Sequence, residues 1–346
     1  MRPQVIHLVD DCKLGGVKVA LENLSGSSLN RMFDFKISTL NLHSWFPRRY
    51  RADIICLHAA VSWRKLPGLC LLRLMNIGTP LLFQEHHYSE CFVRHRVTSP
   101  LRFLVMLRLS YCVVTHVLAV SNAQADWMKK ERLTSRERLT VVGQAVDVSA
   151  FLKLPPKAVV APIVLGAYGR LDSQKGFDLL LQAMAKLPPE QVELRLAGDG
   201  EELSKFEQSW GQLPHVHFVG EVQDVPRFLS RCDAVVIPSR WEPFGLSCQE
   251  TLAAGKPVIT SGVDGLDEQL SEVESMTSET VRLIKLEELS PERLVEVIER
   301  LIADARTLSA GEHLVSLGLS RQVREGAAQR WPRLIQRWRE ILNIYL

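Results

Sequence analysis

The chain has 346 residues, of which 46% are hydrophobic and 23% charged, so it is an ordinary globular chain with enough apolar surface for a large core. Its length favours two domains over one or three. No apolar run approaches the roughly 20 residues that span a bilayer. The seven cysteines form no C-x-x-C pair, which argues against a disulfide scaffold or a zinc site.

The first residues, MRPQVIHLVDD, carry acids within a dozen positions and no small-residue cleavage site. They predict a first strand and not a signal peptide. Scattered cysteines are what a reducing cytosol tolerates. Together these features predict a cytoplasmic protein.

The charge is unevenly distributed along the chain. Residues 1–150 hold 20 Lys and Arg against 11 Asp and Glu, a net charge of +9, and the remainder holds 22 against 28, a net charge of −6. One interpretation is ordinary variation in surface charge. The other is that the first half meets an anionic partner, such as a membrane surface, a phosphorylated acceptor or nucleic acid.

The first half alternates apolar runs with helical patterns. Helices are predicted to begin near Gly16, Trp63, Pro100 and Ser121, the last with a good N-cap. The predicted strands are Gln4–Val9, Phe35–Leu40, Asp53–His58, Pro80–Glu85, His116–Val120 and Leu139–Val142. Residues 153–162 hold three prolines and no helical period, which predicts an interdomain linker.

The second half repeats the alternation more clearly. The predicted strands are Ile163–Tyr168, Val192–Ala197, Val216–Val219, Ala234–Ile237, Val258–Thr260 and Val281–Ile284. The predicted helices are Gly176–Lys186, Glu201–Trp210, Val225–Cys232, Leu246–Ala254 and Pro291–Ala305. Alternating strands and helices predict parallel sheets covered on both faces.

The fold class predicted is therefore α/β, with two Rossmann-like β/α/β domains at residues 1–152 and 163–328. Two such domains would face each other across a cleft at the carboxyl ends of their strands. Ligands of open α/β sheets usually bind at these ends. The last segment, residues 329–346, has the pattern of an amphipathic helix that packs back on the body.

The turn from Gly169 to Gly176, GRLDSQKG, follows a predicted strand and opens a helix. Arg170 offers a planar fork for phosphate oxygens and Lys175 a point charge. The spacing matches neither a P-loop nor G-x-G-x-x-G. The alternative is a plain β–α turn with solvated cations, and Gly198 marks another such turn.

Two carboxylates, Glu242 and Glu250, flank the start of a predicted helix at Leu246. Glu242 falls at the carboxyl end of a strand, the free N–H groups at Leu246 suit a diphosphate, and Glu250 can accept hydrogen bonds from a vicinal diol. A glycosidase acid pair and a solvated first-turn acid are the alternatives.

In this order, the segments GRLDSQKGFDLLLQAM, LRLAGDGEEL, VHFVGEV and DAVVIPSRWEPFGLSCQETLAAGKPVI resemble the nucleotide-sugar domain of retaining glycosyltransferases of family 4, which have the GT-B fold. The resemblance is specific from Gly166 to about Glu268, and the Glu-x7-Glu spacing is that family's mark. It implies that Arg170 and Lys175 hold the donor diphosphate. Glu250 would bind the ribose diol and Glu242 the donor sugar. The other donor-binding residues implied are Gly15, Gly16, Gly169, Gly198, Glu221, Val222, Phe244, Gly245 and Leu246, with backbone near Glu221 and Val222 reading the base.

In the first half, the family places a histidine at the end of the strand Leu81–Glu85, near the anomeric carbon of the sugar. His86 is the candidate, His87 the second choice, and a structural histidine the alternative. The sequence departs from the family at Gln144–Asp147, where Asn-Gly-Val-Asp is common, and residues 271–285 lack a further Asn-Gly.

The resemblance implies a retaining transfer of a sugar from a nucleotide-diphosphate sugar, with UDP-sugars favoured, to a glycan or lipid-linked hydroxyl in bacterial surface polysaccharide or lipopolysaccharide synthesis. Arg170, Lys175, Glu242 and His86 would be the catalytic residues. No Asp-x-Asp motif is present, so neither a metal nor another cofactor is expected. A GT-B nucleotide-sugar epimerase and a non-catalytic nucleotide-sugar-binding relative are the rival interpretations. The sequence has no aromatic–basic motif of the kind that binds nucleic acid, so nucleic-acid binding is not expected.

Two segments, Trp63–Arg73 and Arg94–Arg108, mix cations with apolar residues. They are either core-facing helices with basic outer faces or a surface that rests on the anionic inner leaflet of the cytoplasmic membrane.

Overall fold

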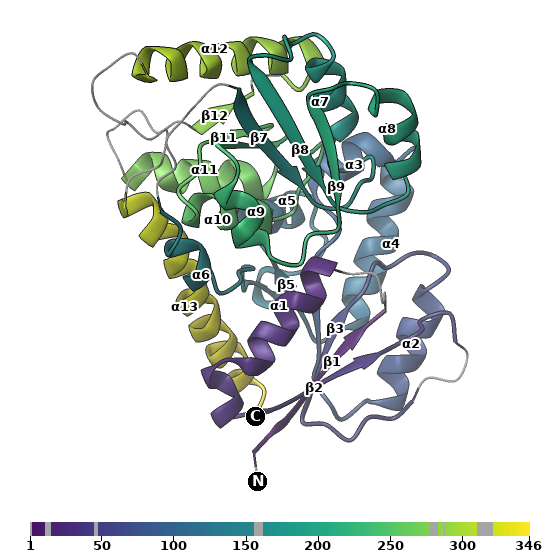
Figure 1. Ribbon diagram of the computed structural model, residues 1–346. Coiled ribbons are helices and arrows are strands. Elements are labelled where there is room, and N and C mark those ends of the chain that lie inside the picture. The colour runs from purple at the N-terminus through teal and green to yellow at the C-terminus, as the bar shows by residue number, and fades with distance from the viewer. Residues whose placement is uncertain are drawn as a thin grey trace. The chain divides into compact units, whose positions relative to one another are not determined.

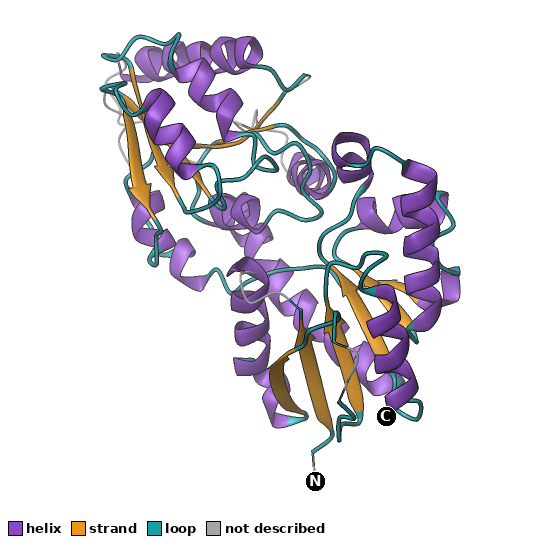
Figure 2. Ribbon diagram, turned by 90° about the vertical axis from the view of Figure 1, so that its right-hand side faces the viewer, coloured by secondary structure: helices purple, strands orange, loops and turns teal. Residues whose placement is uncertain are grey.

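The structure is a computed structural model that describes residues 2–10, 15–44, 48–155, 162–276, 283–286, 288–309 and 321–346. The chain divides into two compact units: unit 1 comprises residues 1–146 and 330–346, and unit 2 comprises residues 147–329. Each unit contains one six-stranded sheet, and Figures 1 and 2 show helices packed around both sheets. Of the predicted linker 153–162, residues 156–161 lie outside the described residues.

Unit 1 has the strand order β2-β1-β3-β4-β5-β6, and all neighbouring strands are parallel. All six predicted strands are confirmed. They are β1 (Gln4–Val9), β2 (Asp34–Thr39), β3 (Ile54–His58), β4 (Leu81–Glu85), β5 (His116–Ala119) and β6 (Leu139–Val141).

The helices of unit 1 are α1 (Gly15–Gly26), α2 (Leu66–Met75), α3 (Glu90–Arg96), α4 (Pro100–Val113) and α5 (Asn122–Lys130), with 3-10 turns at Ser28–Arg31 and Arg136–Arg138. The Ser121 cap of α5 is confirmed, because the Gln124 N–H donates to Ser121 Oγ at 3.1 Å. Helix α2 begins three residues after the predicted start, with Pro67 in its first turn. Helix α3 was not predicted, although Ser89 Oγ caps it by accepting from the Phe92 N–H.

Apolar side chains cover both faces of the unit 1 sheet. On one face Leu8, Leu57 and Phe83 pack with residues of α2, α4 and α5. On the other face the strands pack against Leu334 and Trp338 of α13 (Arg321–Ile344). The C-terminal helix therefore packs back on unit 1 as predicted, although it starts at Arg321 and contains Pro332.

Unit 2 has the strand order β12-β11-β10-β7-β8-β9, again parallel throughout. Its strands are β7 (Ile163–Tyr168), β8 (Val192–Ala197), β9 (Val216–Gly220), β10 (Ala234–Ile237), β11 (Val258–Thr260) and β12 (Leu283–Lys285). The last is shifted from the predicted Val281–Ile284, whose first two residues lie outside the described ones. This order places the ends of β7 and β10 side by side at the centre of the sheet.

The helices of unit 2 are α6 (Ser149–Leu152), α7 (Phe177–Met184), α8 (Leu203–Trp210), α9 (Val225–Ser230), α10 (Leu246–Ala253), α11 (Gly265–Met276) and α12 (Pro291–Ser309), followed by the first residues of α13. The five helices predicted here are present, while α6 and α11 were missed. Helix α11 begins at Gly265, where no helix was predicted.

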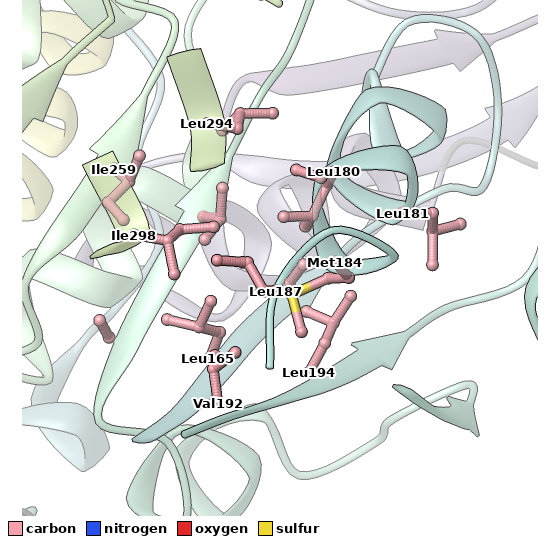
Figure 3. Close-up of a cluster of buried hydrophobic side chains, with 14 of the residues drawn as sticks. Leu165, Leu180, Leu181, Met184, Leu187, Val192, Leu194, Ile259, Leu294 and Ile298 are labelled. Atoms are coloured by element: carbon pink, nitrogen blue, oxygen red, sulfur yellow. The ribbon is translucent and has the colours of Figure 1, made fainter. Parts of the chain in front are cut away.

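A single apolar layer joins the unit 2 sheet to α7 and α12. Figure 3 shows Leu165, Leu194 and Ile259 of the strands pointing toward Met184 of α7 and Ile298 of α12, and all five side chains are fully buried. Burying a side chain of this size stabilises the fold by about 1.5–3 kcal/mol. This layer fixes the sheet so that its carboxyl edge presents loops in a defined arrangement.

Candidate functional site

The turns after β7, β8 and β9 are bonded to one another along the carboxyl edge of the unit 2 sheet. The Gly198 N–H donates to the Gly220 carbonyl at 2.8 Å, and the Gly169 N–H donates to the Ala197 carbonyl at 3.1 Å. Gly198 has φ +138°, and a Cβ there would lie 1.9 Å from the Gly169 carbonyl oxygen. Only glycine fits this position, so Gly169 and Gly198 form part of one continuous surface at the sheet edge.

Lys175 and Glu242 form an ion pair at this edge. Lys175 Nζ lies 2.5 Å from Glu242 Oε2, and the two side chains are only 18% and 10% exposed. Ser239 Oγ donates to the same carboxylate oxygen at 3.3 Å. The loop after β7 thus meets the loop after β10, and the sequence-predicted cation and acid come together. A charge pair this sheltered can bind an anion through the lysine and hydroxyls through the carboxylate.

Arg240 holds the loop that carries Lys175, and sequence reasoning missed this residue. Its guanidinium donates to both carboxylate oxygens of Asp178, at 2.8 and 2.7 Å, and to the Ser173 carbonyl at 2.9 Å. The hydrogen bonds that Arg240 donates to Asp178 raise the pKa of Arg240. A bidentate pair fixes orientation as well as distance, so Arg240 sets the position of residues 173–178. The only sequence feature that could have pointed to Arg240 is its position two residues before the predicted site residue Glu242.

The backbone around Glu242 is fixed by residues near the start of α11. The Glu242 N–H donates to Asp264 Oδ2 at 3.0 Å, and Gln269 Nε2 donates to the Phe244 carbonyl at 2.7 Å. Gly245 precedes α10 with φ +93°, and a Cβ there would lie 2.6 Å from Leu266 Cδ2. Helix α10 begins at Leu246 as predicted, so its first turn follows directly on the Glu242 loop.

Glu250 lies in the second turn of α10 and is bonded to Tyr168 at the end of β7. The tyrosine hydroxyl lies 2.9 Å from Glu250 Oε2 and 3.0 Å from the Ser247 carbonyl. The residue keeps partial exposure, yet burial raises the pKa of Glu250 to about 7, against smaller lowering effects of Tyr168 and Lys175. Once ionised, a carboxylate that is poorly solvated gains from hydrogen bonds donated by a ligand's hydroxyls.

Three other predicted residues are more open. The Arg170 side chain is 56% exposed, and its Nε lies 3.6 Å from Asp172 Oδ2. Glu221 is exposed and Val222 half-buried after the end of β9. The structure therefore groups Lys175 with Glu242 through an ion pair, and the charge of Lys175 lowers the pKa of Glu250. Arg170, Glu221 and Val222 lie at the rim of the same sheet edge.

In unit 1, the predicted residues lie at the ends of β1 and β4. Gly15 and Gly16 are the first residues of α1. His86 follows β4 directly and shares a hydrogen bond with His58, whose Nδ1 lies 2.9 Å from His86 Nε2. Burial lowers the pKa of His86 to about 3, so the ring is neutral at physiological pH.

The loop that carries His86 is held by Glu85, which is completely buried. Its Oε1 accepts from the backbone N–H groups of His87 and Tyr88, at 2.7 and 3.2 Å. The Tyr111 hydroxyl donates to Oε2 at 2.7 Å. Burial raises the pKa of Glu85 to about 7, against these hydrogen bonds, which lower it. Glu85 was not among the sequence-predicted site residues.

On α2 and α4 of unit 1, and just after α2, six apolar side chains are exposed. We call this set the apolar stripe: Cys70, Leu74, Ile77, Leu101, Val105 and Leu109. Leu101 is 74% exposed and Ile77 67%. Arg102 of α4 is also exposed, and its guanidinium lies 5.9 Å from the centre of the Trp63 ring. No helix within the described residues is both long and apolar enough to cross a membrane.

Metal ligands do not gather in the part of the chain that the structure describes: it contains no group of three or more His, Cys, Asp or Glu side chains arranged to hold an ion.

The two parallel α/β units, with an ion pair and a polar carboxyl at one sheet edge, have the fold of a GT-B glycosyltransferase. HepE of Anabaena, solved in complex with UDP and glucose, superposes with a TM-score of 0.72 at 19% identity, covering 99% of this chain and all of that one (100%). WaaB, a lipopolysaccharide outer core galactosyltransferase solved in its apo form, gives a TM-score of 0.63 at 14% identity, with 99% and 100% coverage. At these identities the likeness shows the fold.

The profile of the family described as "Glycosyl transferases group 1" matches residues 155–313. An uncharacterized 41.2 kDa protein in the cps region of Klebsiella pneumoniae is 30% identical over 314 residues, which are 78% of this chain and 83% of that protein. The lipopolysaccharide core biosynthesis glycosyltransferase LpsE of Rhizobium meliloti (strain 1021) is 35% identical over 169 residues, which are 46% of this chain and 47% of LpsE. Residues 155–313 thus form a group 1 glycosyl transferase domain, and the chain spans about half the length of LpsE.

Proposed function

We propose that the protein transfers a sugar from a nucleotide-diphosphate sugar, with a UDP-sugar favoured, to a hydroxyl of a glycan or lipid-linked acceptor. The observation that carries this proposal is the sheltered pair of Lys175 and Glu242 beside Glu250 at one sheet edge. A cation, a carboxylate and a raised-pKa carboxyl supply the three kinds of contact that a diphosphate, a sugar and a ribose require. The UDP and glucose bound to HepE and the role of LpsE in lipopolysaccharide core synthesis support the donor and the acceptor class.

Each residue has a proposed role in donor binding. Lys175 and the more exposed Arg170 bind the diphosphate, together with free N–H groups at the start of α10. Glu242 accepts hydrogen bonds from sugar hydroxyls, and Glu250 accepts them from the ribose diol. Backbone near Glu221 and Val222 contacts the base. Gly15, Gly16 and His86 of unit 1 contact the same donor, with His86 bonded to the sugar.

The proposed chemistry retains the anomeric configuration and needs no metal. The bond between the anomeric carbon and the diphosphate oxygen breaks, and Lys175 and Arg170 stabilise the charge that develops on the departing oxygen. The acceptor hydroxyl forms the new bond on the face that the diphosphate leaves. Its proton passes to the departing diphosphate, so no protein base is required.

A thermal-shift screen of nucleotide diphosphates and their sugars, followed by product analysis with the labelled donor that binds, tests this function. Transfer or slow hydrolysis with release of the nucleotide supports it. A labelled donor converted to its epimer would identify the isomerase, and a stabilising donor that stays intact with every acceptor offered would identify a non-catalytic binder.

We further propose that the apolar stripe on α2 and α4 rests on an anionic membrane surface, where a lipid-linked acceptor would be met. The inner faces of these helices bury Leu69, Leu72 and Leu107 as core-facing helices do. Their outer faces carry exposed leucines as well as arginines, and a purely solvated basic face would not need them. Salt-sensitive flotation with anionic liposomes supports this placement, and the absence of flotation contradicts it.

A further inference from the structure

Three histidines, two fully buried and the third half-buried, form a continuous hydrogen-bonded chain in unit 1. His7 Nδ1 lies 2.9 Å from His58 Nε2, and His58 Nδ1 lies 2.9 Å from His86 Nε2. His7 and His58 are both 0% exposed. Only His86 of the three was singled out by its sequence pattern, and nothing in the donor site uses the other two.

The register of the parallel sheet produces this chain. His7 of β1 is paired with Cys56 of β3, and His58 lies two residues further along β3 on the same face. Leu57 is paired with Phe83 of β4, so His58 stands beside Gln84, and His86 again lies two residues further on. A stagger of two residues from strand to strand keeps all three rings on one face, the face covered by α13.

The three rings are neutral at physiological pH, because burial lowers the pKa of His7 to about 4, that of His86 to about 3 and that of His58 well below its usual value. A neutral imidazole carries one N–H and one bare nitrogen. Each of the two links needs one N–H and one bare nitrogen facing each other. The chain therefore has two arrangements: all three rings protonated at Nδ1, or all three protonated at Nε2.

The two ends of the chain decide between these arrangements. His7 Nε2 is buried without a hydrogen-bond partner, and the rings of Phe35 and Trp338 lie with their centres 5.7 Å from the His7 ring. Protonation at Nε2 would leave a buried N–H group without an acceptor there, which is rarer and costlier than a bare nitrogen. His86 borders a cavity of about 20 Å³, also lined by Gln84 and Gln144, which is room for about one oxygen-sized group. At the other end of the three-histidine chain, the His86 ring interacts with the Gln144 side chain, whose amide oxygen can accept from an Nδ1–H, although Nδ1 meets no strict hydrogen-bond geometry. This is the end where an acceptor is available.

We propose that His7 and His58 are positioning residues that hold His86 in its Nδ1-protonated tautomer, so that His86 donates a hydrogen bond and does not accept a proton. Aligned donors polarise one another, by about 10–30% per bond, so the terminal N–H is a stronger donor than an isolated imidazole. The ligand atom it fits is a neutral or anionic oxygen, such as a sugar hydroxyl. That last step rests on the proposed function, whereas the tautomer does not.

The test uses the full chain labelled with ¹⁵N-histidine at neutral pH, with two-bond ¹H–¹⁵N spectra that separate the two tautomers. We expect Nδ1-protonated rings at His7, His58 and His86. The His7→Phe substitution keeps an aromatic ring but removes the hydrogen-bond donor to His58. We expect the Nε2-protonated form of His86 to appear in this variant. His7→Asn keeps an amide donor near the position of Nδ1, and we expect the wild-type tautomer to return. His116→Phe is the matched control, because His116 is a buried histidine of the same sheet bonded to Thr140 and outside the chain.

Nε2-protonated or charged rings in the wild type, or a His86 tautomer that His7→Phe leaves unchanged, would overturn the proposal. A kinetic comparison adds the functional step: kcat/KM should fall about tenfold in His7→Phe and recover in His7→Asn. If no sugar transfer is found at all, the proposed function fails while the spectra still decide the tautomer.

Discussion

Glu250 makes donor binding depend on pH in a way that the structure lets us calculate. Burial raises its pKa to about 7, from an ordinary value of 4.5. If the ionised carboxylate is the form that binds the ribose diol, about 10% of the free protein is competent at pH 6 and about 90% at pH 8. The apparent affinity for a nucleotide-sugar should therefore rise about tenfold between these pH values.

The same pKa fixes the sign of the stability effect. A carboxyl whose pKa is higher in the folded than in the unfolded state stabilises the fold at low pH, and this contribution is lost as the pH rises from about 4.5 through about 7. The pKa difference between the folded and unfolded states corresponds to a destabilisation of the fold by at most about 3 kcal/mol when Glu250 is ionised. Partial exposure of the side chain reduces this energy. Glu250→Gln should thus raise the melting temperature of unit 2 by several degrees at pH 8 and by little at pH 5.

Isothermal calorimetry with UDP-glucose at several pH values measures the first effect, since the phosphodiester groups of this ligand do not titrate near neutral pH. The Glu250→Gln variant should bind more weakly at pH 8 and show no rise between pH 6 and 8. Glu85→Gln is the control, because Glu85 has an equally raised pKa in unit 1 and should leave the slope of affinity with pH in place. A pH-independent wild-type affinity, or a Gln variant that keeps the slope, would refute the reasoning.

Three further changes test the rest of the site. Lys175→Ala should lower kcat/KM at least 100-fold and cost about 1–3 kcal/mol of stability, because Glu242 is left sheltered without its cation; near wild-type turnover would contradict its role. Arg240→Lys should lower donor affinity several-fold, since the bidentate bond to Asp178 is lost, and calorimetry that shows unchanged affinity would remove its positioning role. Leu101→Asp should abolish flotation with anionic liposomes and leave turnover of a soluble acceptor unchanged, so persistent flotation would count against the apolar stripe.

The strands could be predicted well because each is a short apolar run bounded by turn residues. β1, β7, β8, β10 and β11 have the predicted bounds, and the remaining strands differ by one or two residues. The helices that were missed are short or polar at the start. Helix α3 has seven residues and buries none of them completely, so its sequence lacks the apolar periodicity that predicts a helix.

The donor side of the site could be predicted because its residues lie in four local segments with a recognisable order. The contacts between those segments could not. Lys175 and Glu242 are 67 positions apart, and Tyr168 and Glu250 are 82 apart. Only the neighbouring positions of β7 and β10 in the sheet bring them together. Arg240 was overlooked because a lone arginine between a strand and a glutamate has no pattern of its own.

The histidine chain shows the limit most clearly. His7, His58 and His86 each stand at or near the carboxyl end of a strand, which the sequence does reveal. Whether they touch depends on the register of two strand pairs, and a shift by one residue would turn a histidine to the opposite face. Sequence patterns fix the face of a side chain within one strand, but not its partner on the next.

The two units treat ionisable groups differently, and this difference bears on their proposed parts in the reaction. In unit 2, Lys175 and Arg240 each form an ion pair with a carboxylate, and cations at this sheet edge suit a diphosphate. In unit 1, the buried groups near His86 are instead held neutral or costly to ionise: three imidazoles with lowered pKa values and Glu85 with a raised one. Neutral donors in a dry environment bind hydroxyls without attracting the phosphate charge away from the lysine. A unit built in this way would contribute orientation of the sugar, while the stabilisation of the leaving group would come from unit 2.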